Sequence, residues 1–393
     1  MAQKVLQKAK AAKKDEFYTQ LKDIEDELRH YKAQFRGKVV YCNCDDPYES
    51  NFFKYFVLNF KHLELKALIT TSYKPSPIDE VQLPLSLEMI EPKVVEQKGR
   101  PKAKAKRFII KDVGDINGDG SYNLQDVAEQ LKANKNNEWS PLKGDAQYPA
   151  GDFRSRECVE LLEQADIVVT NPPFSLFREY IAQLVEHKKK FLIIGNKNAI
   201  NYKEIFKLIS EDKLWLGYRN INSDMWFEVP AGNAYEKIVD GKKVKHIMAC
   251  WFTNLDTTKR HEEFTMYRKY SPELYPHYDN YDAINVNVVA DIPMNFEGVM
   301  GVPITFLDKY NPEQFELLGL SQKVGMGLES IKKYDDYVEV RPDGSLTGSS
   351  GRKTNGNPVM SGKPVKGNYY KNGDSFAYSL YGRIFIKNKK VAK

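Results

Sequence analysis

One apolar segment of the chain ends in an asparagine and two prolines, a combination suited to recognising an amine. The run Asp166–Thr170 has an apolar centre, and Asn171-Pro172-Pro173-Phe174 follow it directly. Ligands of open α/β sheets bind beyond the carboxyl ends of strands, so this tetrapeptide should face a site. Two prolines remove two backbone donors and stiffen the turn. The Asn171 oxygen, the Pro172 carbonyl and an aromatic face then form a receptor for a flat group that carries an exocyclic NH2.

Four further blocks accompany this motif along the chain. They are Lys14–Gln20 (KDEFYTQ), Asn43–Phe52 (NCDDPYESNF), Gly151–Ser155 (GDFRS) and Gly298–Phe306 (GVMGVPITF). Together with Asn-Pro-Pro-Phe, they resemble the EcoRI-type adenine-specific DNA methyltransferases, in which Asn-Pro-Pro-Phe or Asn-Pro-Pro-Tyr follows an apolar strand. The resemblance runs from residue 14 to about residue 320. The alternative is that the tetrapeptide is only a strand-ending turn, and the order of the blocks disfavours it.

The resemblance implies a fold, a cofactor and a set of site residues. The family has a Rossmann-like methyltransferase sheet, uses S-adenosyl-L-methionine and methylates N6 of adenine in DNA. Carried over by position, the catalytic residues are Asn171, Pro172, Pro173 and Phe174. The cofactor-binding residues implied in the same way are Tyr18, Thr19, Asp45, Asp46, Asn51, Asp152 and Asn171.

Two features depart from the usual methyltransferase pattern. The second strand ends in Thr70-Thr71-Ser72-Tyr73, without the acid that holds the cofactor ribose in most methyltransferases. The first loop offers Asp45-Asp46-Pro47 in place of a glycine-rich turn. The sequence therefore assigns no residue to the ribose.

The implied reaction has its difficulty in the adenine amine, because the lone pair of N6 is delocalised into the ring. A methyl group on a sulfonium is already a strong electrophile. Hydrogen bonds from N6–H to the Asn171 oxygen and the Pro172 carbonyl would favour a more tetrahedral nitrogen whose lone pair points at the methyl carbon. Orientation and these acceptors would supply most of the acceleration. The base would leave the duplex and stack on Phe174.

A second motif matches the spacing of an EF-hand-type calcium loop. Its proposed ligands are Asp115, Asn117, Asp119 and Asp126, with Gly120 at the sixth position. A helical segment follows from Leu124, as a calcium loop requires, but no helix is expected before it. The sequence thus predicts a calcium site, and the alternative is an Asp/Asn/Gly turn that caps the helix without an ion.

Apolar segments of strand length alternate with helical segments over much of the chain, which is typical of an α/β fold. We expect a Rossmann-like sheet of about seven strands with helices on both faces. The expected strands are Lys38–Asp45, Leu65–Thr71, Asp166–Thr170, Phe191–Gly195, Leu214–Gly217 and His246–Phe252. The expected helices are Lys4–Phe35, Phe52–Val57, Glu157–Gln164, Phe177–Glu186 and Lys203–Glu211.

An inserted segment, about residues 74–150, interrupts this alternation and is rich in Pro, Lys and Asp. It contains the basic run Lys98–Arg107. Such a run is either a solvated loop or a contact to DNA phosphates.

Three regions are expected along the chain. Residues 1–36 form an N-terminal helical arm with cofactor-motif residues, residues 37–255 the methyltransferase domain, and residues 256–393 a β-rich DNA target-recognition region. The tail Arg352–Lys393 has ten Lys and Arg residues and one acid, which suits phosphate contacts. Tyr378, Leu380, Ile384 and Ile386 alternate as in a packed terminal strand, and such packing is compatible with a basic face. The stretch Gly344–Gly362 is expected to be a loop that becomes ordered on DNA.

Composition sets the limits of these interpretations. The chain has 393 residues and a formal net charge of +6, which permits a nucleic-acid partner without requiring one. Four cysteines exclude a disulfide scaffold. We expect no secretory signal, because the first residues lack an apolar core, and no membrane span, because no apolar run is long enough. The cytoplasm is the expected compartment.

The predicted activity is site-specific transfer of a methyl group to N6 of a flipped-out adenine in double-stranded DNA. A cognate restriction endonuclease is a candidate partner in restriction-modification, and a monomer is favoured. Two alternatives remain: a methyltransferase that acts on another amino group, such as RNA adenine or protein glutamine, and an inactive DNA-binding protein on the same fold.

Overall fold

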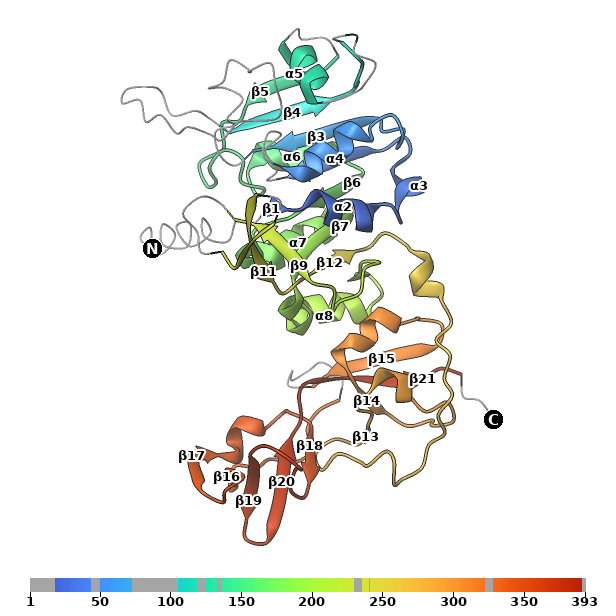
Figure 1. The fold of residues 1–393 in the computed structure, drawn as a ribbon, viewed down its shortest axis with the longest axis vertical. Helices are drawn as coiled ribbons and strands as arrows, with labels where there is room; N and C mark the ends of the chain where they lie inside the picture. Colours follow the sequence, from blue (N-terminus) through green and yellow to red (C-terminus); the bar gives the residue numbers. More distant parts are fainter. Residues whose placement is uncertain are drawn as a thin grey trace. The chain divides into compact units, whose positions relative to one another are not determined.

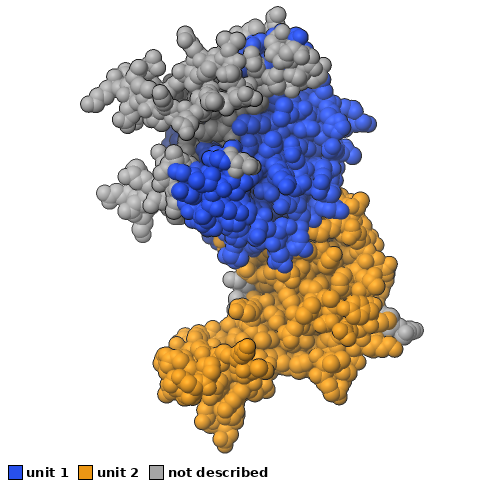
Figure 2. All heavy atoms as spheres, in the orientation of Figure 1, with its two compact units in different colours: residues 1–199, 217–255 blue, residues 200–216, 256–393 orange. Residues whose placement is uncertain are grey.

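The chain divides into two compact units (Figure 2). The first comprises residues 1–199 and 217–255, and the second comprises residues 200–216 and 256–393. The computed structural model describes residues 18–43, 50–72, 105–116, 118, 124–132, 136–229, 235–239, 241–321 and 328–390. None of the helices in this described part is both long and apolar enough to cross a membrane.

A large mixed sheet forms the centre of the first unit, which confirms the α/β class. Its strands in this unit are β2 (Val39–Asn43), β3 (Ala67–Thr71), β4 (Lys106–Ile110), β5 (Glu138–Pro141), β6 (Ile167–Thr170), β7 (Lys190–Asn196) and β12 (Ala249–Thr253). Their spatial order is β5-β4-β3-β2-β6-β7-β12 (Figure 1). Strands β3, β2, β6 and β7 are mutually parallel, whereas β12, β4 and β5 pair antiparallel.

The order of the parallel strands reverses direction beside β2. From β2 the chain moves to β3 on one side, and it later returns to β6 on the other side. In open α/β sheets, a crevice opens beyond the carboxyl ends of the strands at such a reversal, and ligands bind there. The ends of β2 and β6 therefore mark the expected position of a site.

Helices cover both faces of this sheet. They are α2 (Leu21–Leu28), α3 (Lys32–Phe35), α4 (Asn51–Leu58), α5 (Leu124–Lys132), α6 (Arg156–Gln164) and α7 (Phe177–Glu186). Adjacent residues of β12 point to opposite faces. Trp251 meets Phe52 of α4 with ring centroids 6.0 Å apart, and Phe252 meets Phe177 of α7 at 5.0 Å. Helices α4 and α7 thus pack on opposite sides.

A glycine allows α7 to approach the sheet closely. A Cβ atom at Gly195 of β7 would lie 2.4 Å from the Phe177 ring. Any larger residue at this position would push α7 away from the strand. Because α7 begins shortly after the Asn-Pro-Pro-Phe motif, this close packing also fixes the motif's downstream end.

A smaller sheet, which the sequence did not predict, belongs to the same unit. Its strands are β1 (Tyr18–Thr19), β9 (Met225–Glu228), β11 (Lys242–Ile247) and β10 (Lys237–Val239), in the order β1-β9-β11-β10. Two predictions are corrected here. A single helix over Lys4–Phe35 is wrong, because β1 precedes α2 and the chain breaks again before α3. The strand His246–Phe252 is in fact the end of β11 and most of β12, in two different sheets.

The inserted segment contributes more structure than expected. Strands β4 and β5 extend the large sheet antiparallel to β3, and α5 lies between them in the sequence. Of the basic run Lys98–Arg107, only the last three residues are described. Lys106 lies over the Trp139 ring at 4.1 Å, and Arg107 donates to Ser140 Oγ at 2.7 Å.

The second unit is rich in β-structure, as predicted for the region beyond residue 255. It contains α8 (Lys203–Ser210) and β8 (Trp215–Leu216). One sheet has the order β13-β14-β21-β15, formed by Ile284–Asn285, Met300–Pro303, Arg383–Asn388 and Phe315–Leu320. The other has the order β17-β16-β19-β20-β18, formed by Leu346–Ser350, Val338–Val340, Tyr369–Asn372, Ser375–Ser379 and Val359–Ser361.

The basic tail is part of this β-structure. Ile384, Phe385 and Ile386 are completely buried in β21, which lies between β14 and β15. The prediction that Gly344–Gly362 is a flexible loop is wrong, because this stretch contains β17, a 3-10 turn and β18. The packing interpretation of Ile384 and Ile386 is confirmed.

Candidate active site

Hydrogen bonds tie together the carboxyl ends of the three central strands. At the end of β2, Asn43 Oδ1 accepts from Thr71 Oγ1 of β3 at 2.9 Å. The backbone oxygen of Asn43 accepts from the Thr170 hydroxyl of β6. Tyr41 OH lies 3.2 Å from Thr71 Oγ1. Since these side chains are buried, the carboxyl ends of β2, β3 and β6 form a rigid and polar surface beside the reversal of strand order.

The Asn-Pro-Pro-Phe motif follows β6 at this edge, as the sequence predicted. Pro172 is buried, and Asn171, Pro173 and Phe174 are partly buried. The backbone then makes a 3-10 turn from Phe174, in which Leu176 N donates to the Pro173 carbonyl at 2.9 Å, and α7 begins at Phe177. Two prolines and this turn leave the motif little conformational freedom.

Strand β9 connects this motif to Thr19, which belongs to the sequence block Lys14–Gln20. Phe174 meets the buried Phe227 edge to face, with ring centroids 6.5 Å apart. Phe227 is also the cross-strand partner of Thr19 in β1. Asn51, the first residue of α4, donates from Nδ2 to the Thr19 carbonyl at 2.7 Å. Three predicted site residues, Thr19, Asn51 and Phe174, are thereby brought into one neighbourhood.

Thr19 provides a test of whether the site fits the implied cofactor. Its side chain is buried, and Oγ1 has no hydrogen-bond partner among the described residues. A buried hydroxyl without a partner costs free energy unless a ligand or water satisfies it. A polar group of S-adenosylmethionine, such as its carboxylate, would provide that partner. The residues present therefore fit the cofactor at this point.

Asp152 lies just before α6 and is held by an arginine. Arg154 Nε donates to Asp152 Oδ1 and Nη2 to Oδ2, both at 2.9 Å, while Nη1 reaches Glu179 of α7 at 2.8 Å. The hydrogen bond to Asp152, together with both carboxylates, keeps the pKa of the Arg154 guanidinium above its ordinary value. This ion-pair network joins the Gly151–Ser155 block to the helix that follows Asn-Pro-Pro-Phe.

The remaining predicted cofactor residues are Tyr18, Asp45, Asp46 and Asn171. Tyr18 pairs with Glu228 in β1 and β9, one position along from Thr19 and therefore on the other face of the small sheet. Asp45 and Asp46 lie outside the described residues. Asn171 is part of the motif described above.

The calcium prediction finds no support in the described residues. Asn117 and Asp119 lie outside them. Asp115 Oδ1 accepts from Gly118 N at 2.7 Å, and the buried Asp126 accepts from Ile116 N at 2.9 Å. The first bond closes an Asx turn within the loop, and the second ties the loop to Asp126 of α5, so both carboxylates have protein partners. Within the part of the chain that is described, no group of three or more His, Cys, Asp or Glu residues could hold a metal ion.

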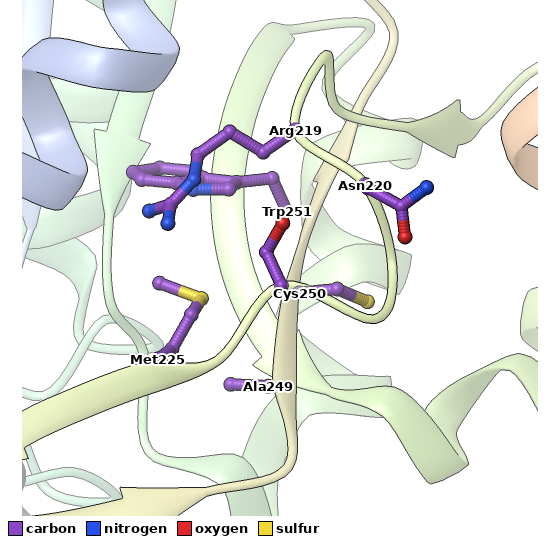
Figure 3. A pocket seen from close by; sticks show the side chains of 7 residues that line it. Arg219, Asn220, Met225, Ala249, Cys250 and Trp251 are labelled. Atoms are coloured by element: carbon purple, nitrogen blue, oxygen red, sulfur yellow. The ribbon is translucent and has the colours of Figure 1, made fainter.

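A small hollow lies beside the loop that leads into β9. Figure 3 shows the side chains that line it, which are Arg219, Asn220, Ser223, Met225, Ala249, Cys250 and Trp251. The indole nitrogen of Trp251 is buried there without a hydrogen-bond partner among the described residues. The hollow has room for about one water molecule, so it is too small for a nucleobase.

Phe227 is the site residue that the sequence interpretation missed. The local signal was the run Met225-Trp226-Phe227-Glu228, which has strand-forming residue types but spans only four residues. Such a short run does not reveal its partner strands. The partner β1 is shorter still, with two residues.

Comparisons with known proteins identify the family of the chain. The sequence profile described as "Adenine-specific methyltransferase EcoRI" matches residues 5–389. The chain therefore belongs to the EcoRI family of adenine-specific methyltransferases, and it is an enzyme of that class. The resemblance inferred from the sequence blocks is confirmed.

Individual relatives carry the same type of name. The chain is 45% identical over 323 residues to the type II methyltransferase M.EcoRI of Escherichia coli, covering 80% of this chain and 88% of that protein. It is 35% identical over 338 residues to M.MpnI of Mycoplasma pneumoniae, covering 83% and 88%. It is 36% identical over 336 residues to M.MgeORF184P of Mycoplasma genitalium, covering 83% and 89%. No solved structure matches the chain.

Proposed function

We propose that this protein methylates N6 of one adenine within a specific sequence of double-stranded DNA, using S-adenosylmethionine. The observation that carries the proposal is the position of Asn171 to Phe174 at the carboxyl end of β6, beside the reversal of strand order. This is where an open α/β sheet binds its ligands. We also propose that the large sheet is a Rossmann-like methyltransferase sheet.

The first unit supplies the proposed cofactor site. Thr19 Oγ1 would hold a polar group of the cofactor, and Asn51 fixes the backbone of Thr19 through the 2.7 Å hydrogen bond to its carbonyl. Tyr18, Asp45, Asp46, Asp152 and Asn171 complete the proposed set. When bound, S-adenosylmethionine supplies a methyl group on a positively charged sulfur.

Asn171 and Pro172 would receive the target amine. Their oxygens are hydrogen-bond acceptors held in a stiff turn, so they would accept both N6 hydrogens and favour a tetrahedral nitrogen. Acceptors that are oriented in advance would lower the barrier. The methylated nitrogen would be positively charged and would lose one proton to solvent after the new bond has formed, so no general base is needed in the transition state. Guanine and thymine present other groups and would leave these acceptors unsatisfied.

Phe174 would stack on the target base after it leaves the duplex. Its ring is partly exposed, and Phe227 supports it from within the unit. Flipping is required because a paired adenine cannot bring N6 within reach of a site at the end of a strand.

The remaining residues are proposed to serve recognition. Residues 256–393 would read the DNA target, and residues 1–36 and 37–255 would carry the cofactor motif and the reaction. Because its substrate is the cell's DNA, we propose that the enzyme acts in the cytoplasm. We also propose that it is a monomer. A cognate endonuclease that cuts the unmethylated site is its proposed counterpart.

The test is the variant Asn171→Ala. We expect methyl transfer to fall by a factor of at least about 100, because removal of one oriented electrostatic group costs several kcal/mol in the transition state. The measurement is single-turnover transfer of labelled methyl groups to bacterial genomic DNA. Sequencing of modified bases in DNA from cells that express the wild-type protein identifies the target.

DNA affinity serves as the control. It should remain near its wild-type value in Asn171→Ala, as measured by fluorescence anisotropy. If the variant retains near-normal turnover, Asn171 has no part in the reaction. If the wild-type protein leaves DNA unmodified, the proposed function itself is wrong.

A further inference from the structure

One row of side chains runs across the small sheet from the proposed cofactor site to a lysine. In antiparallel strands, directly opposite residues share one face of the sheet. Thr19 of β1 lies opposite Phe227 of β9, and Phe227 lies opposite Lys245 of β11. Since Phe227 contacts Phe174, this face is the one that meets the Asn-Pro-Pro-Phe motif.

The row continues outward along β11 and β10. Lys243 lies two residues from Lys245 and so points to the same face. Its cross-strand partner is Ile238, which is 58% exposed. Neighbouring strands are about 4.8 Å apart, and alternate residues of a strand about 6.6 Å apart. The backbone of Lys245 therefore lies about 5 Å from that of Phe227, and the backbone of Lys243 about 8 Å from it.

Neither of these lysines pairs with a carboxylate among the described residues. Lys245 is partly buried, and no ion pair or hydrogen bond of its side chain is found among the described residues. Lys243 is exposed and lies over the Tyr235 ring at 5.0 Å. By contrast, Lys242 points to the opposite face and pairs with Glu228 at 2.7 Å.

A partly buried ammonium group without a counter-charge is costly unless an anion approaches it. Phosphates of the DNA backbone are anions that must lie close to any flipped nucleotide. We propose that Lys243 and Lys245 contact the DNA phosphates next to the flipped adenine and so position the duplex over the catalytic motif. This inference rests on the proposed function, and it assigns part of the DNA contact to the catalytic unit itself.

The experiment compares two faces of the same strand. Lys243→Gln with Lys245→Gln is the test variant, and Lys242→Gln is the matched control. Binding to a fluorescent duplex of about 30 base pairs is measured by anisotropy over a salt series. Each phosphate contact contributes about 0.9 to the slope of log affinity against log salt. We therefore expect the double variant to lose about 1.8 units of slope and to bind roughly tenfold or more weakly near 0.1 M salt.

Two further measurements separate this role from others. Lys242→Gln should keep the wild-type slope. Lys245→Arg, which retains the charge, should keep binding near the wild-type value, whereas Lys245→Gln should weaken it. Cofactor affinity should stay unchanged in every variant. An unchanged slope in a folded double variant would overturn the inference, and so would a loss of cofactor binding with normal DNA binding. Failure of the wild-type protein to methylate or bind DNA would instead overturn the proposed function.

Discussion

Phe174 illustrates how a side chain of the motif depends on a residue far away in the sequence. Its ring packs against the main core cluster of the first unit and meets Phe227 at an interplanar angle of 89°. Edge-to-face contacts of this kind favour one ring orientation over others. Because Phe174 remains partly exposed, part of its ring stays available to a ligand.

At this scale we predict that Phe174→Ala weakens methyl transfer by about 1–3 kcal/mol, the usual contribution of one base–aromatic stack. The measurement is single-turnover transfer, together with the fluorescence of 2-aminopurine placed at the target position. Fluorescence enhancement on binding should fall, since a base flipped as proposed would lose its stacking partner.

Phe174→Tyr is the matched control, because it keeps the aromatic face and should retain most of the activity. Thermal unfolding of both variants distinguishes loss of stacking from loss of core packing. Unchanged 2-aminopurine fluorescence in a folded Phe174→Ala variant would refute the stacking role.

Helix α2 shows how one element anchors a distant loop. The buried carboxylate of Glu27 accepts from Tyr31 OH at 2.7 Å and from the backbone nitrogens of Tyr218 and Arg219 at 2.6 and 2.9 Å. A Cβ atom at Gly217 would lie 2.4 Å from this carboxylate, so the loop approaches α2 as closely as a glycine allows. The loop leads directly into β9, which carries Phe227.

At the scale of this element we predict that Glu27→Gln lowers the free energy of unfolding by about 1–3 kcal/mol. The carboxamide NH2 would face hydrogen-bond donors that the carboxylate now satisfies, and a buried donor without a partner carries a cost of this size. Urea denaturation measures the loss.

The control is Glu25→Gln, on the exposed side of the same helix, which should leave stability within about 0.5 kcal/mol of wild type. Equal midpoints for the two variants would show that Glu27 does not anchor the loop.

At the scale of the whole molecule, the C-terminal tail combines a structural strand with a proposed DNA-contacting surface, and an experiment must separate the two roles. Strand β21 lies between β14 and β15 with three consecutive apolar side chains fully buried, so truncation before Arg352 would remove a central strand. Several exposed lysines of the tail lie outside β21, in β19 and the loop before it. Lys363 lies over the Phe376 ring at 4.3 Å, and Lys371 lies over the same ring at 5.8 Å.

We therefore predict that Lys363, Lys366 and Lys371, changed together to Gln, reduce DNA affinity while the fold survives. These side chains are exposed, so their loss should cost little stability. The salt dependence of binding should lose about one unit of slope for each phosphate contact removed. Circular dichroism and thermal unfolding verify the fold. Should the slope stay at its wild-type value, these lysines are only solvated surface residues.

The sequence by itself determined many of the local elements. Strand β6, the Asn-Pro-Pro-Phe turn and helix α7 are short-range features, because strand periodicity, proline geometry and helix periodicity are all read within a few residues. The central strands β2, β3 and β7 were predicted for the same reason. Family blocks added the enzyme class.

Only the tertiary structure decided which of these residues meet. The small sheet joins residues 18–19 to residues 225–228 and 242–247, and no local pattern specifies pairing over such separations. Strands of two to six residues give weak periodic signals, and their stability comes from partners that lie far away in the sequence. For this reason Phe227 and Lys245, which connect the motif to the rest of the sheet, become visible only in three dimensions.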